Sequence, residues 1–265
     1  MAAQPIENYG VIGNMRSIAL VSIEGAIDFF CFPNFDSPTV FAALLDNEAG
    51  GTFRIDPDLE NVRTKQLYLP ETNILLTRFL SDSGLAEITD FMPVQSGKKG
   101  KIYAHQIIRM VRVIKGEVRF HMRCAPRFNY ARAKHTAHLE NRIVCFEPED
   151  KQLCPCMTLH ATLPLELDGN DAVASFSLHA GGTAMFAFGE EDRSKELLAK
   201  GSVEHHFQET ARYWRDWVGH SNYSGRWREM VNRSALLLKL LCSGFTPRSP
   251  SRDRPLVRVR VFRAR

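Results

Sequence analysis

Hydrophobic and polar residues alternate in short runs over most of the first 200 residues of this 265-residue chain. Within residues 118–124, Val, Phe, Met and Cys alternate with Arg, His and Arg, and residues 174–179 repeat the pattern with Ala, Phe and Leu against Ser, Ser and His. A period of two places successive side chains on opposite faces of a strand. Each run therefore predicts a strand with one face toward a core and the other toward water.

Pairs of such runs are separated by short turns, which predicts β-hairpins. The pairs are 17–21 with 26–32 around Glu24-Gly25, 73–80 with 85–92 around residues 81–84, and the two runs that flank Lys115-Gly116. No helical period lies between them. The predicted fold is therefore mainly β, a large antiparallel β-sandwich.

The periodicity changes near residue 202. Apolar residues at positions 203, 207, 211, 214 and 218 fall on one face of a helix, and Ser202 is predicted as its N-cap. After a polar break at residues 220–225, residues 226–241 predict a second helix that is apolar on all sides near its end. Such a helix is normally buried by other helices.

Residues 242–265 form an irregular tail rich in Arg, Pro and Ser. They hold seven Arg and one Asp, a net charge of +6, whereas the preceding 241 residues hold 27 basic and 29 acidic residues, a net charge of −2. The basic balance thus belongs to the tail and does not predict a nucleic-acid-binding domain. The tail fits either out-of-frame reading or truncation of a longer gene, or a genuine basic extension.

The location of the chain follows from what its sequence lacks. No apolar run approaches the ~20 residues of a membrane span, and residues 1–7 have neither the basic nor the apolar region of a signal peptide. We expect a cytoplasmic protein without membrane contact, whose six cysteines are reduced.

Cys154, Cys156 and His160 are the nearest approach to a metal site. A structural zinc site needs four ligands, usually in two clear pairs, and no second pair is evident. On a strand, the two cysteines would share one face as small core residues. We therefore predict no metal and no cofactor.

Residues 6–14, 25–38 and 41–45, with the run Thr89-Asp90-Phe91-Met92-Pro93, resemble bacterial family 15 glycoside hydrolases, the glucoamylase- and trehalase-like enzymes. The resemblance implies an N-terminal β-sandwich followed by a catalytic barrel of paired helices. Together with the change of periodicity, it predicts residues 1–201 as the sandwich and 202–241 as a linker helix and the first barrel helix of an incomplete catalytic domain. Residues 242–265 are then an aberrant or disordered tail.

The resemblance also implies a chemistry. Family members hydrolyse α-glucosidic bonds with inversion, using a carboxylic acid and a carboxylate ~6.5–9.5 Å apart, and both come from the barrel. No residue of this chain is therefore predicted to be catalytic. We expect a parent enzyme that acts on trehalose or α-glucans, and a chain that is inactive alone. The alternatives are a stand-alone carbohydrate-binding or interaction module, and a fragment completed by a separately encoded barrel.

The candidate substrate-binding residues, as far as this chain has any, are Asp28, Asn34, Asp36, Arg127 and Tyr130. Each also has a structural interpretation. Asp28 is predicted to share a strand face with Ala26, Phe30 and Phe32, so it would need backbone amides or an Arg as partners. Asn34 and Asp36 are turn-forming residues, and packing or a salt bridge explains Arg127 and Tyr130 equally well.

The second predicted helix also has a consequence for assembly. An exposed apolar helix face promotes self-association. We expect the chain to associate through residues 227–241, because the Arg-rich tail is a poor cover for leucines.

Overall fold

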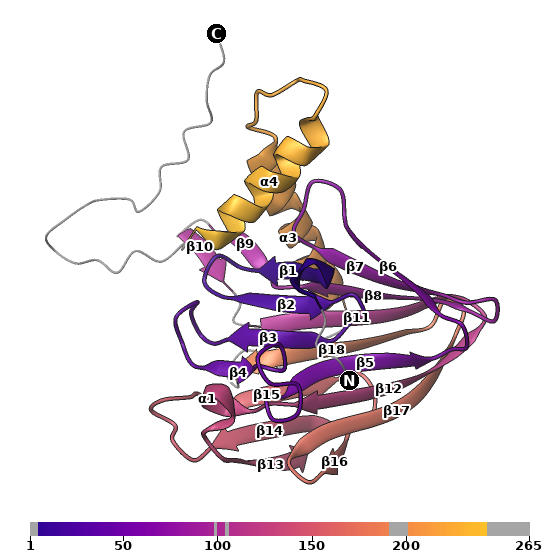
Figure 1. Ribbon diagram of the computed structural model, residues 1–265, viewed down its shortest axis with the longest axis vertical. Coiled ribbons are helices and arrows are strands. Elements are labelled where there is room, and N and C mark those ends of the chain that lie inside the picture. Colours follow the sequence, from indigo (N-terminus) through magenta and orange to yellow (C-terminus); the bar gives the residue numbers. More distant parts are fainter. Residues whose placement is uncertain (1–4, 98–99, 104–105, 191–200, 243–265) are drawn as a thin grey trace, which may run out of the picture.

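The computed structural model describes residues 5–97, 100–103, 106–190 and 201–242. Two large antiparallel sheets pack face to face, and two long helices lie together beyond one end of them (Figure 1). The predicted mainly-β sandwich followed by helices is confirmed. No helix among the described residues is long and apolar enough to cross a membrane.

The first sheet carries the N-terminal strands and runs from β1 at one edge to β16 at the other. After the short 3-10 helix η1 (Ile6–Asn8), its strands in spatial order are β1 (Tyr9–Gly13), β2 (Ile18–Ser22), β3 (Ile27–Cys31), β5 (Thr52–Asp58), β12 (Glu117–Ala125), β17 (Asp171–His179) and β16 (Glu166–Asp168), with β4 (Thr39–Phe41) paired to β3.

The second sheet runs from β13 to β6, and a small hairpin stands apart from both sheets. In spatial order, the strands of the second sheet are β13 (His135–Glu140), β14 (Ile143–Pro148), β15 (Met157–Ala161), β18 (Thr183–Glu190), β11 (Gln106–Lys115), β8 (Leu85–Phe91), β7 (Leu75–Leu80) and β6 (Arg63–Tyr68). The hairpin consists of β9 (Val94–Gly97) and β10 (Gly100–Tyr103), and the helices are α1 (Phe128–Ala131), α3 (Ser202–Val218) and α4 (Arg228–Leu241).

Two of the predicted hairpins are confirmed, β2 with β3 and β7 with β8. The third is wrong. β11 and β12 flank Lys115-Gly116 but do not pair, because β11 lies between β8 and β18 in the second sheet and β12 lies between β5 and β17 in the first. The connection crosses from one sheet to the other, so the apolar faces of both strands line the same core.

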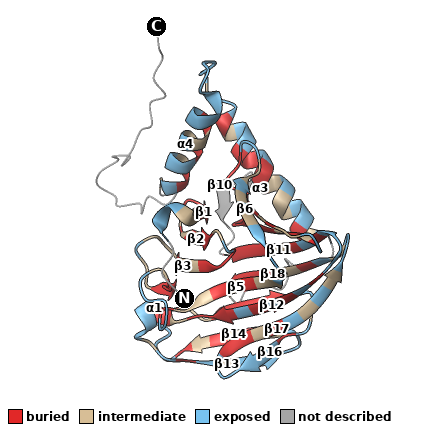
Figure 2. Cartoon of the chain, turned by 45° about the vertical axis from the view of Figure 1, so that its right-hand side comes forward, coloured by how far each residue is buried: buried red, intermediate tan, exposed pale blue. Residues whose placement is uncertain are grey.

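The core between the sheets is rich in phenylalanine, and the buried positions run along the middle of the strands (Figure 2). Phe41, Phe53 and Phe188 lie within 5.2–6.4 Å of one another, measured between ring centroids. Tilted and edge-on ring pairs at such distances add stability beyond the area they bury.

A charged pair is completely enclosed in this core. Arg109 of β11 and Asp90 of β8 have no exposed side-chain surface, and the Arg109 Nε lies 2.8 Å from Asp90 Oδ1. The guanidinium also donates to the Phe53 carbonyl of β5 at 2.5 Å and to the Gly25 carbonyl in the turn between β2 and β3, both on the side of the opposite sheet. Arg109 therefore joins the two sheets by hydrogen bonds as well as by packing.

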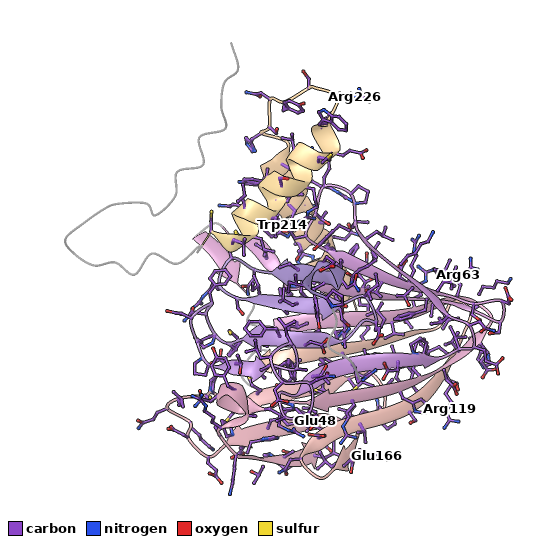
Figure 3. All side chains as sticks on the ribbon, in the orientation of Figure 1. Glu48, Arg63, Arg119, Glu166, Trp214 and Arg226 are labelled. Carbon is purple, nitrogen blue, oxygen red and sulfur yellow. The ribbon has the colours of Figure 1, made fainter. Side chains whose placement is uncertain are left out.

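The two long helices, α3 and α4, share a smaller core with residues of the N-terminal strands β1 and β2. Trp214 of α3 is fully buried there (Figure 3). Leu236 and Leu240 of α4 are buried in the same cluster, with Met15 from the connection between β1 and β2 and Val94 of β9. A hydrogen bond also links α4 to the sandwich, because the Asn73 side chain donates to the Leu236 carbonyl at 3.2 Å.

The start of α3 differs from the prediction by one residue. Gly201 is the N-cap, without a side-chain capping hydrogen bond, and Ser202 is the first helical residue. Gly201 has a φ of 87°, a left-handed conformation that glycine adopts without the steric cost of a Cβ.

The outer strands β1, β6 and β16 differ in their contacts, charge and length. The Tyr68 hydroxyl bonds both backbone polar groups of Val11 in the edge strand β1, accepting from N at 2.8 Å and donating to O at 3.1 Å. β6, the edge of the other sheet, alternates exposed and half-buried residues and exposes Arg63 and Lys65. β16 has only three residues.

Candidate functional site

A bulge in β3 turns Asp28 to the outer surface of the first sheet. In the register with β2, Leu20 lies opposite Phe29 and Val21 lies opposite Ile27, so Asp28 is the extra residue. A bulge re-aims the side chains that follow it. Ile27 and Phe30 consequently both enter the core, and the prediction that Asp28 shares a face with Phe30 and Phe32 is wrong.

Asp28 is held by two hydroxyl groups. The Tyr9 hydroxyl donates to Oδ2 at 3.0 Å, and the Thr52 hydroxyl donates to Oδ1 at 2.8 Å. Burial and the adjacent Asp28 carboxylate raise the pKa of Tyr9, so its hydroxyl remains a donor. The expected partners, backbone amides or an Arg, are not those that hold this carboxylate.

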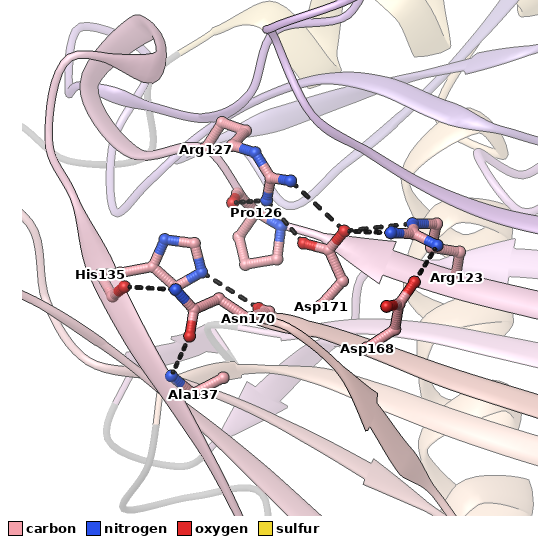
Figure 4. A network of polar contacts seen from close by, with 8 residues as sticks. All are labelled: Arg123, Pro126, Arg127, His135, Ala137, Asp168, Asn170 and Asp171. Atoms are coloured by element: carbon pink, nitrogen blue, oxygen red, sulfur yellow. Dashed lines mark hydrogen bonds and ion pairs between the residues drawn. The ribbon is translucent and has the colours of Figure 1, made fainter.

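A second carboxylate lies farther along the sheet, at the start of β17. Asp171 has only 5% of its side chain exposed, and two guanidinium groups converge on it (Figure 4). Arg123 approaches to 2.7 Å and Arg127 to 2.6 Å. Arg123 also pairs with the exposed Asp168 at 2.8 Å.

The turn before β17 is tied to β13 of the second sheet beside this cluster (Figure 4). Asn170 donates to the His135 carbonyl at 3.0 Å, and the His135 ring nitrogen lies 3.2 Å from the Asn170 carbonyl. Burial lowers the pKa of His135, so the ring is neutral at pH 7. These contacts fix the position of Asp171 between the two arginines.

Residues 42–51 form a loop beside the two carboxylates. Its backbone is bonded to itself through Ala42 and Gly50 (2.7 Å) and to β3 through Leu44 and the Asp28 carbonyl (3.0 Å). Gly51 has a φ of 73°, and a Cβ there would lie 2.3 Å from the Ala125 carbonyl. Only glycine fits so close to β12.

The strands that carry Asp28 and Asp171, together with the loop 42–51, enclose a groove of about 420 Å³ on the outside of the first sheet. Its polar lining is mostly charged. The charged residues are Glu24, Asp28, Glu48, Arg54, Arg123, Arg127 and Asp171. Glu48 comes from the loop, and Figure 3 shows it near the sheet and away from the helical end of the molecule.

The five candidate residues do not form one site. Asp28 and Arg127 both line the groove. Asn34 lies in the turn after β3, where its Oδ1 accepts from Arg16 at 3.2 Å, and Asp36 is exposed in the same turn. Tyr130 is 45% exposed in α1. The structure thus brings two of the five together, and the role of all five in substrate binding stays a prediction.

Sequence reasoning missed Tyr9, Thr52, Arg123 and Asp171 as members of this site. Arg123 was visible as a polar residue on the exposed face of β12. Its pairing with Asp171 was not, because the two residues are 48 positions apart and meet only through the pairing of β12 with β17.

The cysteines considered for metal binding are placed differently from the prediction. Cys154 and Cys156 precede β15 and are not on a strand. Cys154 is buried in the core, and Cys156 is half-buried. Within the described ranges, no group of three or more His, Cys, Asp or Glu side chains is arranged to hold a metal ion.

Comparison with known proteins gives consistent matches. A family model described as "Trehalase-like, N-terminal" matches residues 1–148. The chain is 30% identical to a trehalase of Thermoplasma volcanium over 249 residues, 89% of this chain and 37% of that protein. It is 32% identical to a trehalase of Thermoplasma acidophilum over 235 residues, 84% of this chain and 38% of that protein.

A relative with lower sequence identity matches the same share of the chain. The chain is 26% identical to a trehalase of Mycobacterium tuberculosis over 253 residues, covering 89% of this chain and 37% of that protein. The chain thus spans well under half the length of the curated relatives that it matches.

Proposed function

This chain belongs to the trehalase-like N-terminal family, and on that premise we propose that it is the non-catalytic β-sandwich part of an α-glucoside hydrolase. The parent reaction is the inverting hydrolysis of trehalose or short α-glucans, and α-glucosides are partners of this part only beside a complete catalytic domain. The observation that carries the proposal is similarity to trehalases that extends over 89% of this chain but only 37% of the relative.

The contacts of two groove carboxylates, Asp28 and Asp171, support a non-catalytic role. Inverting hydrolysis needs one carboxyl group to protonate the leaving oxygen and a second to activate water. Asp171 instead has both oxygens bonded by Arg123 and Arg127, and Asp28 has both oxygens bonded by hydroxyl groups. These contacts suit a rigid scaffold better than proton transfer.

We therefore expect the purified 265-residue chain to release no glucose from trehalose, maltose or soluble starch above a buffer control. Glucose is measured enzymatically over a day, with a trehalase of full length as the positive control. Turnover proportional to the concentration of this chain, and retained after repurification from a host that lacks such enzymes, would refute the proposal.

The exposed face of α4 supports self-association as a second property of the chain. Trp227, Met230 and Leu238 are 56%, 65% and 55% exposed and border a shallow apolar depression of about 600 Å³. The sequence predicted that the leucines of this helix would lack a cover. This is correct only for the exposed face, because Leu236 and Leu240 are covered by the sandwich and α3. An apolar helix face of this kind fits a second copy of the same face.

Leu238→Gln is expected to shift the chain from oligomer toward monomer, since a polar side chain at this position would have to be desolvated in the contact. The measurement is light scattering over a range of concentrations. Leu139→Gln is the matched control, because Leu139 is 42% exposed in β13, on a different element. A wild-type chain that is monomeric at every concentration would disprove self-association.

A further inference from the structure

We propose that the groove on the outer face of the first sheet binds a neutral polyhydroxyl ligand of about disaccharide size. Its volume of about 420 Å³ falls within the range of small-molecule sites, roughly 300–1,000 Å³. The proposal goes beyond the proposed function, because a chain that hydrolyses nothing can still bind a sugar.

The charge of the groove selects the class of ligand. Its lining has four carboxylates and three guanidiniums, a net charge of −1. A phosphate or carboxylate ligand would have to approach the carboxylates, and a cation would have to approach the guanidiniums. A sugar hydroxyl both donates and accepts a hydrogen bond, so it can use either kind of group without repulsion.

The donors on one side of the groove have capacity left. A guanidinium has five N–H donors. Arg123 uses three of them, on Asp168 and Asp171. Arg127 also uses three, on Asp171 and the Pro126 carbonyl. Each arginine therefore retains two N–H donors, and both side chains are partly exposed at 45% and 35%.

The other side of the groove supplies acceptors. Each oxygen of Asp28 accepts one hydrogen bond, from Tyr9 or Thr52, and a carboxylate has about four acceptor positions in all. β5 separates β3 from β12, so the strands that carry Asp28 and Arg123 are roughly 10 Å apart. That spacing allows two linked sugar rings to bond both sides at once.

The groove is also preorganised, which reduces the entropy lost on binding. Asp171 is nearly fully buried and clamps both arginines. The loop that borders the groove is fixed by backbone hydrogen bonds at Ala42, Ala43 and Leu44.

The test is calorimetric titration of the full chain with trehalose and with maltose, and with inorganic phosphate as the anionic probe. We expect saturable millimolar binding of at least one disaccharide and none of phosphate. Arg123→Gln and Asp28→Asn should each weaken binding about tenfold or more, because each removes a charge-assisted hydrogen bond. Glucose release is measured in the same samples, so failure of the proposed function is seen separately.

Two matched controls keep the test specific. Arg119→Gln lies on the same strand as Arg123, and Asp58→Asn lies in the first sheet at the end of β5; both side chains are exposed and outside the groove. These variants should bind within about twofold of wild type, as surface substitutions generally do. Thermal unfolding identifies any variant that fails to fold, in which case the other groove variant carries the test. Absence of disaccharide binding, equal weakening by the controls, or tighter binding of phosphate would overturn the proposal.

Discussion

Arg109→Met is expected to lower the free energy of unfolding by about 3–5 kcal/mol, the cost of removing one partner of a buried ion pair. The substitution leaves Asp90 fully buried without its cation. It also leaves the Phe53 carbonyl of β5 and the Gly25 carbonyl of the β2–β3 turn without this donor. Burial already raises the pKa of Asp90, so Asp90 should take up a proton in the variant.

Urea unfolding followed by circular dichroism at a strand-sensitive wavelength measures this loss. Arg112→Met is the matched control, because Arg112 lies on the same strand but is exposed, and its effect should stay within about 0.5 kcal/mol. A further variant, Arg109→Met with Asp90→Asn, should recover part of the loss, since no charge is left in the core. Equal stability of Arg109→Met and wild type would show that the pair does not hold the sheets together.

Trp214→Ala is expected to cost about 3–5 kcal/mol in the part of the fold that joins α3 and α4 to the sandwich. Trp214 has no exposed surface and lies in one cluster with Met15, Leu236 and Leu240. Its loss leaves a cavity at the junction, so the helices should melt before the sheets.

Circular dichroism at a helix-sensitive and a strand-sensitive wavelength separates these two events during heating. Tyr223→Ala is the control, because Tyr223 is 38% exposed and lies outside the apolar depression on α4, and its removal should change the midpoint very little. A single coincident transition in Trp214→Ala, with an unchanged midpoint, would contradict the expectation.

The fold class was readable from the sequence because it depends on local alternation. Residues 118–124 alternate in the structure as the pattern predicts, with apolar side chains buried and polar ones exposed. The partners of the strands were not readable in the same way. A turn at Lys115-Gly116 is compatible with a hairpin or with a connection between the two sheets. The chain adopts the connection, because it buries the apolar faces of both β11 and β12 in the same core.

The site was less predictable for a related reason. Alternation placed Asp28 inward, and one extra residue in β3 reverses that assignment. The partners Arg127 and Asp171 are 44 positions apart and have no common local signal. What sequence alone supplied was the identity of two groove residues; the groove itself depends on a bulge and on long-range strand pairing.

The bond between Tyr68 and Val11 has a consequence for how this protein can misassemble. An edge strand with free N–H and C=O groups is a template onto which another chain can add a strand, the first step toward amyloid-like growth. Tyr68 occupies both backbone groups of Val11, at the edge where an incoming strand would need them. With charged side chains on β6 and only three residues in β16, three of the outer strands are poor templates. Strand addition should therefore be disfavoured at these three edges, and aggregates that grow through them should bind little thioflavin.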